Sequence, residues 1–147
     1  MPSHAEKRVL PYTSEQLFDL VMDIEKYPEF MPWCIATRIN SRGKDELNAD
    51  VIVGFKLMRE KFNSTVIFKR AKTIEVEYKQ GPMKHLQNRW VFKDLKGGQC
   101  EVDFYIEFSM KTKIFEALVD QFFYRVLVKM INSFEARAAD LYGTKKP

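Results

Sequence analysis

The last segment of the chain, residues 113–142, constrains the fold more than any other. Its apolar residues recur at helical spacing and predict one long helix. Polar residues form only a narrow stripe along it: Glu116, Asp120, Arg125, Lys129, Asn132 or Ser133, and Arg137. A surface helix needs an apolar face only somewhat wider than about 100°. The apolar surface here is wider, so we predict that a concave partner, such as a curved sheet, grips this helix.

The middle of the chain changes to the period of two that is typical of half-buried strands. Strands of this kind are predicted over residues 35–40, 47–55, 62–68, 74–79, 86–92 and 100–110. Short turns separate them, and Gly97-Gly98 is a hairpin signal. Turns of this length indicate antiparallel neighbours rather than parallel crossover units.

The N-terminal part predicts one more strand and short helices. Residues 4–10 resemble a strand with poor alternation, ended by Pro11. Thr13 and Gln16 then fit a capping box before an apolar helical run. Tyr27-Pro28 ends that run, because the residue before proline avoids the helical conformation. We therefore predict a single α+β domain over residues 1–147, with a curved antiparallel sheet of about seven strands around the long C-terminal helix and short helices after the first strand.

Two stretches of the chain resemble a known family. Residues 14–34 include the run Tyr27-Pro28-Glu29-Phe30-Met31-Pro32-Trp33-Cys34, and a glycine-proline turn at Gly81-Pro82 precedes Leu86, Asn88, Trp90 and Phe92. This pattern is similar to that of the coenzyme Q-binding START-domain family, a polyketide cyclase-like group that includes bacterial ribosome-association toxins. The resemblance covers residues 3–141. It implies a helix-grip (START-like) fold with an apolar tunnel, and it implies two different activities.

The first implied activity is the binding of a hydrophobic ligand, ubiquinone or a related isoprenoid lipid, by a carrier or chaperone that supports respiration. A quinone with an isoprenoid tail needs a long apolar channel and a few polar groups for its head. We predict these ligand-binding residues: Phe30, Met31, Trp33, Val53, Phe55, Asn88, Trp90, Phe104, Phe115, Leu118, Phe122, Phe123 and Val126. For each aromatic residue alone, a place in the core is the competing interpretation.

Asn88 is the polar residue of this set. It lies on the apolar face of its predicted strand, between Leu86 and Trp90, and a buried amide needs hydrogen-bond partners. Those partners are either the backbone, in a structural role, or a quinone carbonyl.

A basic stretch offers a surface for contact with a membrane or RNA. Lys56, Arg59 and Lys61 flank Leu57-Met58, a mixture suited to anionic head groups. The plainer alternative is a solvated face of the sheet. A net charge of +4 permits such contacts without demanding them.

The residues do not predict an enzyme. His4 is expected at a frayed end and His85 on an outer face, and acidic residues fall mostly on polar faces, so no inward carboxylate pair is expected. Cys34 and Cys100 belong to no metal-binding pattern and are expected to be buried thiols. We therefore expect no cofactor and no metal, with the lipid as the bound ligand.

No apolar run reaches the roughly 18–20 residues of a membrane span, and the N-terminus lacks a signal-peptide pattern. We expect a monomer in the cytoplasm, peripheral to the inner membrane, or on the mitochondrial matrix side in a eukaryote. Two alternatives to the carrier stay open. One is a ribosome-association toxin that binds the large ribosomal subunit and blocks subunit joining. The other is an aromatic polyketide cyclase-like enzyme.

Overall fold

A seven-stranded antiparallel sheet is the frame of the protein. The computed structural model describes residues 3–55 and 57–143, and only the backbone of Phe55 and Met58. Within these residues the strand order is β1-β7-β6-β5-β4-β3-β2. The strands are β1 (Ser3–Leu10), β2 (Cys34–Arg42), β3 (Glu46–Phe55), β4 (Met58–Lys69), β5 (Thr73–Gln80), β6 (Met83–Asp94) and β7 (Cys100–Met110). Strands β2 to β7 form the predicted meander, and the last strand, β7, pairs with the first, β1.

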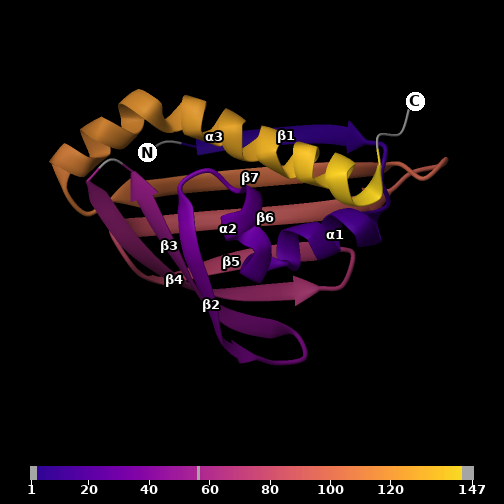
Figure 1. Cartoon of the computed structure of the whole chain (residues 1–147), viewed down its shortest axis with the longest axis horizontal. Coiled ribbons are helices and arrows are strands. Elements are labelled where there is room, and N and C mark those ends of the chain that lie inside the picture. The colour runs from indigo at the N-terminus through magenta and orange to yellow at the C-terminus, as the bar shows by residue number, and fades with distance from the viewer. Residues whose placement is uncertain (1–2, 56, 144–147) are drawn as a thin grey trace.

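The long helix α3 (Lys113–Tyr142) begins and ends as the sequence predicts. The Thr112 side chain accepts a hydrogen bond from the backbone of Phe115 and caps its start, and Gly143 ends it with φ 84°. Figure 1 shows α3 lying along β1 and β7, with α1 and α2 on the same face of the sheet. The predicted helix-grip arrangement is confirmed.

Helix α1 (Ser14–Met22) starts with the predicted capping box. The Thr13 hydroxyl accepts from the Gln16 backbone, and the Gln16 side chain accepts from the Thr13 backbone. Its apolar face is buried against the sheet, where Phe18 packs edge-on against Phe68 and Phe92. The apolar face of α1 therefore covers one end of the sheet.

The segment after α1 is more helical than the proline pattern suggests. A 3-10 turn, η1 (Ile24–Lys26), leads into the short helix α2 (Tyr27–Phe30). Pro28 fits there because proline is tolerated in the first turn of a helix, where its missing N–H would be unpaired anyway.

The core is concentrated at the α1 end. The larger buried cluster joins α1 to the inner sides of β3 to β7 and to the end of α3, while Met83, Phe108 and Met110 form a smaller cluster toward the start of α3. Leu127 and Ala138 are the buried residues of α3. The wide apolar surface of this helix is therefore only partly packed, because much of its first half faces a cavity.

Asp94 ties α1 to the end of β6 and provides a test of this core. Its carboxylate accepts from the Ser14 backbone at 2.8 Å and from the Ser14 hydroxyl at 2.7 Å. These hydrogen bonds, the backbone one first, lower the pKa of Asp94 below its usual value.

We expect Asp94→Ala to lower the urea midpoint of unfolding at pH 7. Because the folded-state pKa is depressed, the stabilisation is present above the unfolded pKa of about 3.9 and is lost as the pH falls through the folded value. The difference from wild type should therefore shrink below about pH 4. Asp120→Ala, at an exposed position of α3, is the control. An equal difference at pH 7 and at pH 3 would contradict this role of the carboxylate.

Candidate functional site

A largely apolar cavity lies between the first half of α3 and the sheet. Its volume is about 350 Å³. The lining residues are Trp33, Val53, Glu60, Phe62, Pro82, Met83, Leu86, Ile106, Phe108, Met110, Phe115, Leu118, Val119, Phe122, Phe123, Val126, Leu127 and Met130. Apolar pockets of about 300–1,000 Å³ are typical small-molecule sites, so this cavity is the candidate functional site.

The helix contributes one continuous stripe to the cavity. Phe115, Leu118, Phe122 and Val126 follow one another at intervals of three or four residues, so they lie on one face of α3. Phe123 extends the stripe and packs edge-on against Phe108 of β7, with ring centroids 5.0 Å apart. The helical spacing that widens the apolar face in the sequence therefore supplies the wall of the cavity.

Glu60 is the one ionisable residue among the described residues of the lining. It lies opposite Val53 in the register of β4 and β3, so both side chains are on the concave side of the sheet. Its neighbours Arg59 and Lys61 point the other way and are exposed. The cavity can thus receive an apolar molecule and offers it very few polar partners.

Trp33 lies at the β2–α2 side of the cavity in a constrained backbone conformation. Its φ is 65°, which is rare for a residue with a bulky side chain. The ammonium of Lys129 lies 5.6 Å from the centre of its ring. A cation over the face of an indole is attracted by the ring, so this contact holds Trp33 against α3.

The structure gathers about half of the predicted ligand residues around this cavity. They are Trp33, Val53, Phe115, Leu118, Phe122, Phe123 and Val126. Phe30 and Met31 are not among them: Phe30 packs against Tyr27 and Phe134, and Met31 is buried. The side chain of Phe55 and all of Lys56 lie outside the described residues.

Asn88 occupies the inner face, but its amide is already bonded within the protein. It donates to the Tyr105 carbonyl at 2.9 Å, and its oxygen accepts from the Trp90 indole at 3.1 Å. The geometry therefore favours the structural role over the quinone contact. The amide ties β6 to β7 and orients Trp90.

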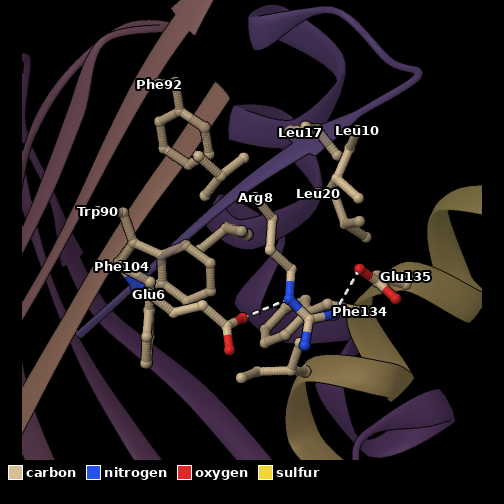
Figure 2. Close-up of a pocket in the computed structure, with 13 residues that line it drawn as sticks. Glu6, Arg8, Leu10, Leu17, Leu20, Trp90, Phe92, Phe104, Phe134 and Glu135 are labelled. Atoms are coloured by element: carbon tan, nitrogen blue, oxygen red, sulfur yellow. Dashed lines mark hydrogen bonds and ion pairs between the residues drawn. The ribbon is translucent and has the colours of Figure 1, made fainter. Parts of the chain in front are cut away.

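Trp90 and Phe104 line a second, smaller pocket of about 60 Å³, between β1, α1 and the second half of α3 (Figure 2). Its walls are apolar, but Glu6, Arg8 and Glu135 also line it. The Arg8 guanidinium donates to Glu6 through Nε and to Glu135 through Nη1, the latter at 2.8 Å. The hydrogen bond to Glu135 is the main cause of a raised pKa of Arg8.

This charged group corrects two expectations. Acidic residues were expected mostly on polar faces, with no inward carboxylate pair, yet Glu6 and Glu135 both face the space between helix and sheet. His4 was expected at a frayed end, yet it is paired in β1, with its Nε2 3.3 Å from the Glu6 carboxylate and its ring edge-on to Tyr124.

The available signal was the alternation of His4, Glu6, Arg8 and Leu10. The inward orientation of these four residues follows only from the register of β1 with β7, in which each of them pairs with an inward-facing residue of β7. His85, in contrast, is exposed on the outer face as predicted.

The two cysteines are free thiols, and burial raises the pKa of both. Cys100 is buried as predicted, whereas Cys34 is only half-buried. A raised pKa keeps a thiol protonated and a poor nucleophile.

In the part of the chain that the structure describes, His, Cys, Asp and Glu side chains nowhere gather in a group of three that could ligate a metal. None of the helices there combines the length and the apolar character that crossing a membrane requires.

Comparison with known proteins agrees with this fold. The family described as polyketide cyclase / dehydrase and lipid transport matches residues 10–135. The solution structure of an 18 kDa protein from Caulobacter crescentus is similar, with a TM-score of 0.76 and 40% identity over 98% of this chain and 100% of that one.

Two curated relatives carry different names. The ribosome association toxin RatA of Rickettsia prowazekii is 36% identical over 96% of this chain and 99% of its own length. The mitochondrial coenzyme Q-binding protein COQ10 homolog B of Xenopus laevis is 29% identical over 97% of this chain and 60% of its own length. The family match spans most of the chain, and this protein therefore belongs to the polyketide cyclase / dehydrase and lipid transport family.

Proposed function

We propose that this protein binds a neutral isoprenoid lipid, ubiquinone or a close relative, in the cavity under α3 and acts as a carrier. The observation that carries the proposal is the apolar cavity of about 350 Å³, with Glu60 as the one ionisable residue among its described lining residues. The name of the Xenopus relative supports the choice of ligand. The cavity is near the lower end of typical ligand sites, so a long tail would extend through the opening.

An exposed rim suits exchange of such a lipid with a membrane. Leu57, between β3 and β4, and Ile114, in the first turn of α3, are large apolar residues left almost wholly exposed. Figure 1 shows α3 starting at the end of the sheet where β3 leads into β4. Arg59 and Lys61 are exposed nearby on β4, and basic residues beside exposed apolar ones favour an anionic bilayer.

A second candidate function is ribosome binding, favoured by the name of the Rickettsia relative. On this proposal the basic face of β4, with Arg59 and Lys61 exposed near its start and Lys69 and Lys72 exposed at its far end and in the following turn, would contact ribosomal RNA of the large subunit. A cyclase would instead need several polar groups inside the cavity. The described lining residues, with Glu60 as the one ionisable group, therefore support a cyclase less than a carrier or a ribosome-binding protein.

The first experiment is organic extraction of the purified protein, followed by mass spectrometry. We expect close to one isoprenoid quinone per protein chain. An empty protein that also fails to bind added ubiquinone would contradict the carrier function. Binding to purified large ribosomal subunits, with an affinity that falls steeply as salt increases, would then support the second candidate.

Filling the cavity should block the ligand at little cost to stability. Val119 lines the cavity, whereas Val66 is buried in the packed core. We expect Val119→Phe to change the free energy of unfolding by less than about 1 kcal/mol, while Val66→Phe costs about 1–3 kcal/mol through overpacking. Urea denaturation measures both, and Val119→Phe should also lower binding of the apolar probe N-phenyl-1-naphthylamine. Equal costs at the two sites would show that the cavity is not free space.

Reversing two charges on the rim should weaken membrane binding. Each basic residue near an anionic bilayer contributes about 1 kcal/mol, so Arg59→Glu with Lys61→Glu should lower affinity by about 30-fold or more. The measurement is co-sedimentation with vesicles of phosphatidylcholine and about 30% phosphatidylglycerol. The double variant Lys93→Glu with Lys96→Glu, at exposed positions at the β6–β7 end, is the control. Equal losses in the two variants would argue against a specific docking rim.

A further inference from the structure

The cavity proposed for the lipid suits a tail better than a head. Among its described residues the lining is apolar apart from Glu60, whereas ligand sites usually fix orientation with a few placed polar groups. A polar head therefore needs a site beyond this lining.

The second pocket is the next space along the concave face. On α3, Met130 lines the cavity and Ile131 lines the second pocket. On β7, Ile106 lines the cavity and Phe104 lines the second pocket. One helix residue advances about 1.5 Å and two strand residues about 7 Å, so the two spaces adjoin.

The second pocket combines flat apolar walls with paired charges. The ring of Trp90 lies 4.7 Å from that of Phe104 and 5.5 Å from that of Phe134, centre to centre. Figure 2 shows Arg8 between Glu6 and Glu135 beside these rings. Aromatic walls suit a flat ring, and the charges provide both hydrogen-bond donors and acceptors.

We propose that Glu6, Arg8 and Glu135 form a head-group site for a neutral ring that carries carbonyl or hydroxyl oxygens, with the tail of the same molecule in the cavity. This inference rests on the carrier function proposed above. A ring carbonyl accepts from the Arg8 guanidinium, and a ring hydroxyl donates to either carboxylate. The site holds two carboxylates and one guanidinium, and this excess of acidic groups disfavours anionic heads such as a fatty-acid carboxylate.

A ring enters only if the pocket widens. The space of about 60 Å³ is smaller than the roughly 150 Å³ that accommodates benzene in a protein interior. The side chains of Arg8 and Glu135 are 37% and 34% exposed, and ion pairs of this exposure contribute little to stability. Separation of this pair, which joins β1 to α3, is therefore the expected way for the head to enter.

The two tryptophans of the chain report which end of the ligand lies where. Trp33 lines the cavity, and Trp90 lines the second pocket. Quinone rings quench indole fluorescence at short range. Trp33→Phe and Trp90→Phe leave one reporter each, and the probe is ubiquinone with a tail of two isoprene units. We expect the protein that retains Trp90 to be quenched much more strongly than the protein that retains Trp33, with affinity measured for each.

Arg8→Gln tests whether the Arg8 guanidinium donates a hydrogen bond to a ring carbonyl of the ligand. We expect about tenfold weaker binding of the same quinone, the weight of one hydrogen bond to a charged group, with a circular dichroism spectrum like that of wild type. Arg42→Gln is the matched control, because Arg42 forms an exposed ion pair with Glu25 away from both pockets. Oleate should compete with the quinone about tenfold less well than a neutral alcohol of equal length.

The outcomes separate the two proposals. Binding that quenches Trp33 but not Trp90, or binding unchanged by Arg8→Gln, would overturn the head-group site and leave the carrier function standing. Absence of binding in wild-type protein, judged by equilibrium partitioning as well as fluorescence, would overturn both.

Discussion

Phe134 connects three parts of the chain, and the position of α3 depends on it. Its ring meets Tyr27 at 5.8 Å, Phe30 at 5.7 Å and Trp90 at 5.5 Å, each edge-on. Pairs of this kind add about 0.5–1.5 kcal/mol each beyond the burial of their surface. Together they fix the second half of α3 to α2 and to β6, close to where α1 completes the core. The first half of the helix then spans the concave sheet with only the small cluster of Met83, Phe108 and Met110 beneath it, and the cavity is the space that remains.

The distribution of core and cavity follows from this one-sided attachment. Around α1 the side chains are closely packed, and Leu17, Phe18 and Leu20 are almost inaccessible. Under the first half of α3, Phe115, Phe122 and Phe123 remain only half-buried, although they are as apolar as any core residue. A chain selected for stability alone would fill such a space, because interiors usually pack as densely as organic crystals. The proposed ligand would supply the missing layer.

Local sequence was enough to predict the elements and much of the wall that α3 contributes to the cavity. The capping box at Thr13, the alternation of β7 and the helical stripe of α3 each depend on neighbours a few residues apart, so periodicity reveals them. Local sequence was insufficient to predict which side chains of β1 point inward and which groups bond to the amide of Asn88. The charged residues of β1 resemble a solvated strand until its pairing with β7 places Glu6 opposite Phe104. The amide of Asn88 is satisfied by the Tyr105 carbonyl, a partner 17 residues away that no local pattern identifies.

The sequence by itself determined the α+β architecture, the gripped helix and the apolar character of the site, because hydrophobic periodicity decides which faces must leave water. Tertiary structure alone decided which apolar residues pack and which line free space. Hydrophobic periodicity treats Trp90 and Phe123 alike, as apolar residues on an inward face. In the structure, Trp90 borders the small charged pocket and Phe123 borders the large cavity. It also decided that Arg8 and Glu135 meet across 127 positions of the chain. Contacts of that separation depend on sheet register and on the docking of α3, and neither is encoded in the residues on either side.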